Sequence, residues 1–277
     1  MAQSKTFVRL LAVVGTAIVA LAFLVPAASA KEPAAGYTQF AGCPSPEENP
    51  KIELCLRNVI TGGHFQMGKK DVPITNAIVL SGGSDVNFEN FAANSKGGLI
   101  PVQQTVPGGV TGLTGLTWLL EFFGVSALSL YATTELAGAP DPNPLKEPIE
   151  LPIRVHLTTP SGVLGSNCYV GGFTNPIKLN LIVGTTSPPG PNKPITGKTP
   201  EFEFDEKEII HFENGQFVDN SFAAPGASGC VLTLFGFIPI SINGLVNSQS
   251  GLPAAAGTNE TRQDFDIEAV EQRLVYP

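Results

Sequence analysis

Strict alternation of apolar and polar residues over positions 151–158 is the feature that most constrains how this chain can fold. Successive side chains of a β-strand point to opposite faces, so such a run predicts a strand with one buried face. The apolar positions are Leu151, Ile153, Val155 and Leu157. Similar alternation recurs over residues 179–183, 201–205 and 264–269. A chain with several such runs is expected to form sheets.

Glycine and proline divide the chain between these runs. The sequence holds 30 Gly and 24 Pro, which interrupt helices and favour turns. The Pro-rich segments 138–148 and 184–200 predict connections without regular structure. We therefore predict an all-β protein, an antiparallel β-sandwich with Pro/Gly-rich loops.

Two glycine-containing pairs give more local expectations. Gly62-Gly63 predicts a turn between Ile60 and Phe65. Asn214-Gly215 is typical of a two-residue β-hairpin turn, and it stands between the apolar segments 209–212 and 217–218. Both pairs are expected to reverse the direction of the chain.

Two weakly charged segments are harder to interpret. In residues 110–137, apolar residues near helical spacing predict one short helix near 113–127 that continues into a strand over 128–136. The apolar run at 231–246 carries no charge and is interpreted as a strand buried on both faces, interrupted at Pro239. The alternative for both segments is contact with a membrane, although Gly112, Gly115 and Gly124 make the first a poor spanning helix.

The N-terminal thirty residues have the pattern of a secretory signal peptide. Lys5 and Arg9 precede an apolar run from Leu10 to Val25, and the small residues at 28–30 predict cleavage after Ala30. The run is about 16 residues long, whereas a membrane-spanning helix needs about 20. The expected location is therefore secreted or at the cell surface.

Signal cleavage leaves residues 31–277 as one secreted β-sandwich domain. The alternative arrangement is two β-halves, at about 37–137 and 149–277. An internal similarity favours this alternative, since Phe91-Ala92-Ala93 precedes Gly98 by the interval at which Phe222-Ala223-Ala224 precedes Gly229.

The four cysteines form an even set in a chain predicted to be exported, so we expect disulfides. They are Cys43, Cys55, Cys168 and Cys230. Of the three possible pairings we favour Cys43–Cys55, which closes a short loop, together with Cys168–Cys230, which joins two strand ends. The spacings include no C-x-x-C pair, and a zinc site is not expected.

Charge excludes two classes of partner. The whole chain has a formal net charge of −8, and removal of Lys5 and Arg9 with the signal peptide makes it −10. Nucleic-acid binding requires a basic patch, which this balance does not favour. It equally disfavours electrostatic attraction to an anionic membrane.

The sequence lacks the common catalytic motifs. It contains no G-x-S-x-G, no H-E-x-x-H, no phosphate-binding glycine loop and no calcium-binding EF-hand spacing. Its three histidines are His64, His156 and His211, and we expect them to be solvated or structural. His211 follows Glu206 and Glu208 and is the weak candidate for a functional role.

The acidic run at 201–205 is the other weak candidate site. Glu201, Glu203 and Asp205 would lie on one face of a strand, about 6–7 Å apart. Such carboxylates suit a surface calcium site or a glycoside hydrolase. The simpler interpretation is an edge strand protected by charge.

Three segments resemble a known group of proteins. The residues that carry the resemblance are the run Pro152 to Gly171, the triplet Ser228-Gly229-Cys230 and the run Gly251 to Gly257. They are similar to exported β-rich proteins of high-GC Gram-positive bacteria that have no assigned activity. The resemblance implies bacterial export and pairing of Cys168 with Cys230, and it transfers no functional residue.

These features predict an exported or cell-envelope-associated β-sandwich protein with a binding or structural role and no catalysis. A secreted hydrolase that uses surface carboxylates is one alternative. A membrane- or lipid-associated envelope protein, based on residues 110–130 and 231–246, is the other. No metal or cofactor is expected, and cell-wall or other envelope components are the expected partners.

Overall fold

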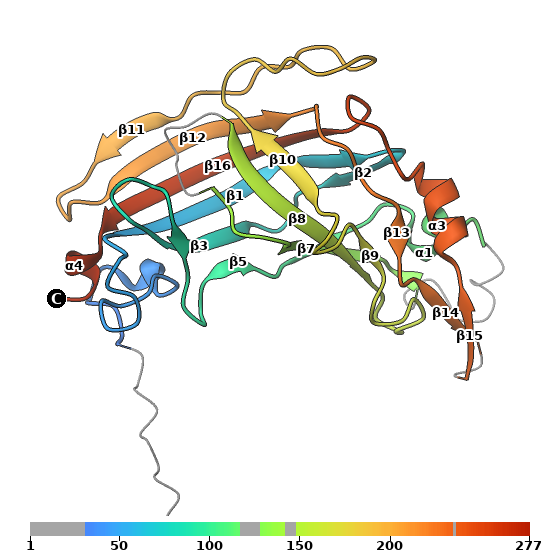
Figure 1. Ribbon diagram of the computed structural model, residues 1–277, viewed down its shortest axis with the longest axis horizontal. Coiled ribbons are helices and arrows are strands. Elements are labelled where there is room, and N and C mark those ends of the chain that lie inside the picture. The colour runs from blue at the N-terminus through green and yellow to red at the C-terminus, as the bar shows by residue number, and fades with distance from the viewer. Residues whose placement is uncertain (1–30, 117–127, 142–147, 235–236) are drawn as a thin grey trace, which may run out of the picture. The chain divides into compact units, whose positions relative to one another are not determined.

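The computed structural model describes residues 31–116, 128–141, 148–234 and 237–277. Within it, Lys31–Pro277 forms one compact unit (Figure 1). The predicted signal peptide lies outside the described residues. Two antiparallel β-sheets make up most of the unit, as the alternating sequence predicts.

The first sheet has the order β11-β12-β16-β1-β3-β4, with β2 paired to β1 and β5 paired to β3. Its longest strands are β1 (Leu54–Met67), β12 (Ile210–Asp219) and β16 (Glu260–Glu271). The others are β2 (Lys70–Pro73), β3 (Ile78–Ser84), β4 (Phe91–Ala92), β5 (Gly98–Ile100) and β11 (Glu201–Phe204).

The second sheet has the order β13-β9-β8-β7-β6, with β10 paired to β8. Its strands are β6 (Gln103–Thr105), β7 (Tyr131–Leu136), β8 (Ile149–Thr158), β9 (Tyr169–Val170), β10 (Ile177–Leu181) and β13 (Ala227–Ser228). A separate hairpin consists of β14 (Val231–Leu234) and β15 (Ile238–Ser241). The described helical segments are η1 (Thr38–Phe40), α1 (Gly109–Thr114), α3 (Asn243–Ser250) and α4 (Gln272–Val275).

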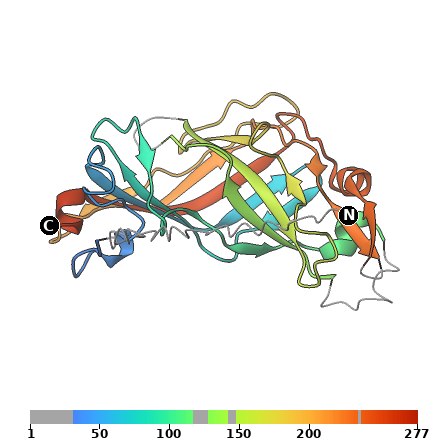
Figure 2. The same ribbon diagram turned by 60° about the horizontal axis from the view of Figure 1, so that its bottom comes forward.

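The two sheets pack face to face, and β8 and β10 cross the long strands β1 and β16 obliquely (Figures 1 and 2). Ile153, Val155 and Leu157 on β8 are buried, and they join Phe265 and Ile267 of β16 in one hydrophobic core. Full burial of an aliphatic or aromatic side chain contributes about 1.5–3 kcal/mol. The predicted β-sandwich is confirmed, and the strand predicted over 151–158 lies within β8.

Both sheets draw strands from both parts of the sequence. In the first sheet β1 lies between β3 and β16, and in the second β7 pairs with β8. Hydrogen bonds also link the two sheets at their edges. The backbone of Ile182, after β10 of the second sheet, exchanges two hydrogen bonds with Val218 of β12 in the first. At another edge, the buried Gln104 side chain of β6 accepts hydrogen bonds from the backbone of Thr75 and Asn76. Each sheet thus contains strands of both segments, 37–137 and 149–277, which meet at β1 and β16 in the first sheet and at β7 and β8 in the second.

The turns predicted at the two glycine-containing pairs are wrong. Gly62-Gly63 lies inside the continuous strand β1, where the pairing with β16 shifts by one residue between Ile60 and Gly62. Asn214-Gly215 lies inside β12, where a second irregularity occurs opposite Asp266. Each pair adjoins or enters a β-bulge, in which Thr61 of β1 and Glu213 and Asn214 of β12 have no partner in register on β16. Gly63 and Asn214 have the left-handed φ that a turn also uses, but the chain keeps its direction.

The weakly charged segments also differ from expectation. Helix α1 begins before the predicted range and ends at Gly115, whose φ of 73° is left-handed; residues 117–127 lie outside the described part of the chain. The strand expected over 128–136 begins only at Tyr131. Residues 231–246 form the β14–β15 hairpin followed by α3, and every residue of β15 is exposed. The prediction of a doubly buried strand there is wrong, because the chain reverses before Pro239.

Candidate functional site

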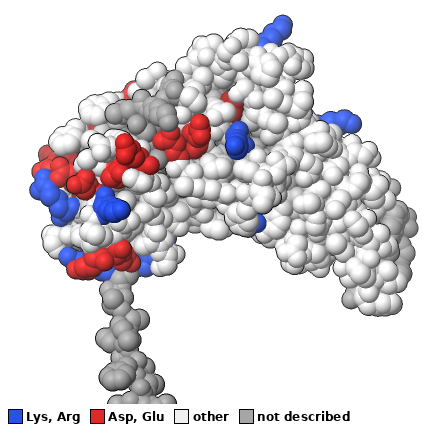
Figure 3. Space-filling model, in the orientation of Figure 1, with Lys and Arg blue, Asp and Glu red and all other residues white. Residues whose placement is uncertain are grey.

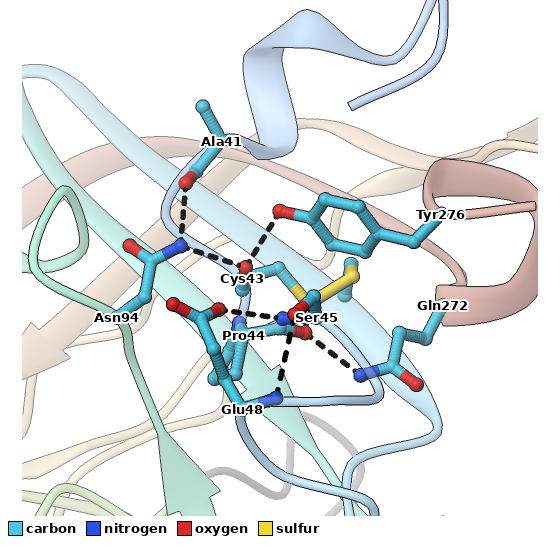
Figure 4. Close-up of a disulfide and its surroundings, with 9 residues drawn as sticks. Ala41, Cys43, Pro44, Ser45, Glu48, Asn94, Gln272 and Tyr276 are labelled. Atoms are coloured by element: carbon cyan, nitrogen blue, oxygen red, sulfur yellow. Dashed lines mark hydrogen bonds between the residues drawn. A yellow bond between two sulfur atoms is a disulfide. The ribbon is translucent and has the colours of Figure 1, made fainter. Parts of the chain in front are cut away.

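Both favoured disulfides are present. Cys43–Cys55 connects the N-terminal segment to β1, and the hydroxyl of Tyr276 donates to the Cys43 carbonyl at 2.8 Å (Figure 4). Asn94 Nδ2 donates to the same carbonyl, and Gln272 Nε2 donates to the carbonyl of Pro44. These bonds fasten the two ends of the described chain to one another around a small second hydrophobic core.

The second disulfide, Cys168–Cys230, joins the residue before β9 to the residue before β14. Both cysteines are fully buried. The backbone N–H of Ile242 donates to the Cys230 carbonyl, and Asn243 Oδ1 accepts from the Cys230 N–H. The base of the β14–β15 hairpin is therefore covalently attached to the second sheet. Two disulfides indicate an oxidising, extracellular environment.

The predicted acidic site is an exposed edge. All four residues of β11 are exposed, and the carboxylates of Glu201 and Glu203 form no hydrogen bond or ion pair with described residues. Asp205 lies beyond the strand, where its Oδ1 accepts the N–H groups of Lys207 and Ile209. Partial desolvation raises the pKa of Asp205, but the hydrogen bonds from Ile209, His211 and Lys207 outweigh it and lower the pKa below its ordinary value. Asp205 thus holds a turn together.

His211 lies among carboxylates on the outer face of the first sheet. Its Nε2 is 3.4 Å from Asp205 Oδ2, and its Nδ1 is 3.9 Å from Glu268 Oε1. Glu268 in turn pairs with Arg57 at 3.0 Å. The neighbouring residues of β12, Ile210 and Phe212, line an apolar hollow on the opposite face, which His211 does not enter. This arrangement is a row of cross-strand charge pairs.

The described residues also offer no metal centre. Within the described segments, no group of three or more His, Cys, Asp or Glu side chains is placed to hold a metal ion. The calcium interpretation of Glu201, Glu203 and Asp205 therefore gains no support from the structure. The other two histidines pair with nearby carboxylates, His64 with Asp71 at 2.8 Å and His156 with Glu135 at 3.4 Å.

An enclosed hollow lies between the two sheets. This inter-sheet cavity has a volume of about 80 Å³ and a wall that is mainly apolar. The first sheet contributes Ile60, Phe65, Ile78 and Leu80, and the second contributes Leu151, Ile153, Leu179 and Leu181. Close packing normally leaves few voids larger than a water molecule in a protein interior. A cavity of this size at the centre of the sandwich is a candidate binding site.

Four polar side chains interrupt the apolar wall: Asn58, Gln104, Thr134 and Gln263. Gln104 uses its amide to hold the loop after β2, as described above. Asn58 differs, because its Oδ1 is buried and accepts no hydrogen bond from any described residue. A buried polar atom without a partner costs about 1–3 kcal/mol. Asn58 is placed where a bound molecule with a donor group would satisfy it.

A smaller hollow of about 60 Å³ adjoins the cavity, and Asn58 and Leu80 line both. The smaller hollow shares Pro140 and Asp141 with a wide surface groove of about 850 Å³. The groove also shares Leu151 and Leu179 with the cavity. We call this groove the entrance groove, because it shares lining residues with both interior hollows.

The entrance groove is polar and predominantly acidic. Its charged residues are Glu89, Asp141, Glu150 and Lys178. One wall is the turn over residues 85–90, where Phe88 has a left-handed φ of 54°. Asp85 holds this turn by accepting the side-chain amide of Asn90 and the N–H of Glu89, and these bonds lower the pKa of Asp85. Such a backbone conformation is costly for a bulky residue and recurs at ligand sites.

None of these residues was a predicted site residue. The cavity wall consists of residue types that ordinarily fill a core, so sequence alone does not distinguish it from close packing. The one available signal is Asn58, a polar residue on the same face of β1 as Ile60, which also lines the cavity. Sequence alone does not show that Asn58 faces inward, because the bulge in β1 changes which residues share a face of the strand.

Comparisons with family models, with curated proteins and with solved structures find no match to this chain. Among the residues that the structure describes, no helix has the length and hydropathy of a transmembrane span.

Proposed function

We propose that this protein is exported, loses its signal peptide after Ala30, and binds a small amphipathic molecule between its two sheets at the cell envelope. The observation that carries this proposal is the apolar inter-sheet cavity that contains the unpartnered Asn58 amide and adjoins the entrance groove. The disulfides and the resemblance to exported β-rich bacterial proteins are consistent with that location.

The size of the cavity restricts what enters it. An apolar cavity of about 150 Å³ accommodates benzene, so a cavity of 80 Å³ suits the end of an alkyl chain and not a whole lipid. The remaining part of the ligand would lie in the smaller hollow and the groove. Burial of each methylene group contributes about 0.8 kcal/mol.

The charge of the groove restricts the polar end of the ligand. Glu89, Asp141 and Glu150 outnumber Lys178 there. A cationic or uncharged polar group is therefore favoured over a carboxylate. The polar groups at the cavity itself are amides and a hydroxyl, which orient a ligand through hydrogen bonds. A binding role follows more directly from these groups than a hydrolytic one.

Titration calorimetry with three ligands of equal chain length tests this proposal: hexylammonium, hexanol and hexanoate. We expect affinity to decrease in that order, with hexanoate at least about fivefold weaker than hexylammonium. An exposed ion pair contributes up to about 1 kcal/mol, and a carboxylate in the same place is repelled.

The variant Glu150→Lys provides the specificity test. Glu150 is exposed in the groove, so its replacement leaves the core unchanged and should shift the preference from hexylammonium towards hexanoate. Glu201→Lys, which makes the same charge change on exposed β11, should leave the order of affinities unaltered. Equal affinity of all three ligands, or an identical response of both variants, would refute the proposal.

A further inference from the structure

The β14–β15 hairpin has a buried side and an exposed apolar side. Leu232 of β14 and Ile242 after β15 are 2% exposed, and the adjacent Cys230 is fully buried. Phe237 is 75% exposed, and on β15 Ile238 is 41% and Ile240, the cross-strand partner of Leu232, 43% exposed. Apolar side chains of this size in one short hairpin are unusual on a solvent-facing surface.

The sequence around the hairpin carries no charge. Between Asp219 and Glu260, residues 220–259 contain no Asp, Glu, Lys, Arg or His. Figure 3 shows the same segregation on the visible face, where red and blue atoms gather towards the end that holds β11, β12 and α4, while the end with α3, β14 and β15 is white. A net acidic chain thus presents an uncharged end.

The exposed phenylalanines of β11 differ in this respect. Phe202 is 66% exposed and Phe204 is 58% exposed, so they resemble Phe237 in exposure alone. Both alternate with the carboxylates of Glu201, Glu203 and Asp205. An apolar surface that approached through β11 would meet these negative charges, whereas one that approached through the hairpin would not.

Helix α3 follows the hairpin directly and extends its uncharged surface. It exposes Leu245, and its last residue, Ser250, accepts the backbone N–H of Lys69. Exposed apolar side chains on an uncharged end of a folded unit suit the boundary between water and acyl chains.

We propose that the β14–β15 hairpin inserts the exposed side chains of Phe237, Ile238 and Ile240 into the surface of a lipid bilayer. Ladder hydrogen bonds between β14 and β15 satisfy their facing backbone groups, and Pro239 has no N–H to leave unpaired on the outer strand. Phe237, Ile238 and Ile240 enter the headgroup–acyl boundary, and the disulfide at Cys230 holds the base. The inference does not rest on the proposed ligand, because it involves a different part of the surface.

Flotation with vesicles of phosphatidylcholine tests the inference on the exported, disulfide-bonded chain. We expect the protein to float with the vesicles and to remain bound at about 0.5 M NaCl, where charge interactions are screened within a few ångströms. The variant Phe237→Ser/Ile240→Ser should reduce partitioning at least about tenfold, since each large apolar side chain contributes roughly that factor.

Phe202→Ser is the matched control, because it removes a similarly exposed phenylalanine from an acidic strand. It should float like the unsubstituted protein. A second variant, Phe237→Asp, places a charge at the most exposed position, where it has no core to disrupt, and circular dichroism verifies that both hairpin variants are folded. Absence of flotation, release by salt, or equal flotation of the folded hairpin variants would overturn the inference.

Discussion

At the scale of single residues, this protein uses side-chain hydrogen bonds to hold turns that frame its surfaces. Asp205 and Asp85 each accept backbone N–H groups from residues two to four positions ahead. Asn259, only 1% exposed, accepts from Gly68 and donates to the carbonyls of Phe222 and Ala255. Polar residues in such positions stabilise the fold through bonds that the residue type alone does not reveal.

The pKa of Asp205 gives a prediction about pH. Because its folded-state pKa lies below the ordinary value of 3.8, the ionised carboxylate stabilises the folded state at neutral pH. This contribution disappears as the pH falls through the lowered pKa. Asp205→Asn should therefore reduce the melting temperature at pH 7, and the difference from the unsubstituted protein should shrink below about pH 4.

Glu203→Gln is the control for this pH dependence, since the Glu203 carboxylate has no described partner. Thermal melts from pH 2 to pH 8 would decide the matter. A Glu203→Gln variant that loses as much stability as Asp205→Asn, or a pH-independent difference for Asp205→Asn, would contradict the assigned role of the carboxylate.

At the scale of elements, the strands were predictable and their irregularities were not. Alternation at 151–158 and 264–269 specifies β8 and β16, because one face of each must be buried. Glycine pairs in β1 and β12 were assigned to turns, since bulges and turns demand the same left-handed angles. Gly63 with φ of 106° and Asn214 with φ of 57° have these angles inside continuous strands.

The β14–β15 hairpin was also not predicted, because its sequence pattern fits more than one structure. An apolar, uncharged run is equally compatible with a strand buried on both faces and with a strand exposed to a lipid surface. The interior cavity could not be predicted either, because packing against the opposite sheet decides whether Leu80 or Leu179 leaves a void. The cysteine pairing, by contrast, followed from spacing and strand ends.

Gly215 in β12 offers a test of the bulge. A Cβ atom at this position would lie 2.3 Å from the ring of Phe265, and that ring is buried and stacked on Phe217 with centroids 3.7 Å apart. Gly215→Ala should destabilise the fold by about 1–3 kcal/mol, the usual cost of overpacking. Urea denaturation measures this difference.

Gly172→Ala serves as the comparison, because a Cβ atom at Gly172 would meet no atom within 4 Å. Its free energy of unfolding should stay close to that of the unsubstituted protein. If both alanine variants unfold at the same urea concentration, the Phe265 ring does not restrict the size of the side chain at position 215.

At the scale of the whole folded unit, the two ends of the β-sandwich differ in surface charge. The acidic end carries β11 and the charge pairs of Arg57, Glu268 and His211, while the uncharged end carries the β14–β15 hairpin. The inter-sheet cavity lies between strands contributed by both parts of the sequence. A ligand in it would therefore contact both sheets and stabilise their association.

The most direct test of the binding proposal is a search for intermolecular nuclear Overhauser effects with hexylammonium. The proposal predicts signals from the terminal methyl group of the ligand to Leu80, Ala132 and Ile153 in the cavity wall, and from its ammonium end to residues of the entrance groove. Signals confined to Ile238 and Ile240 of the hairpin, or an absence of signals from the cavity wall at saturating ligand, would contradict it.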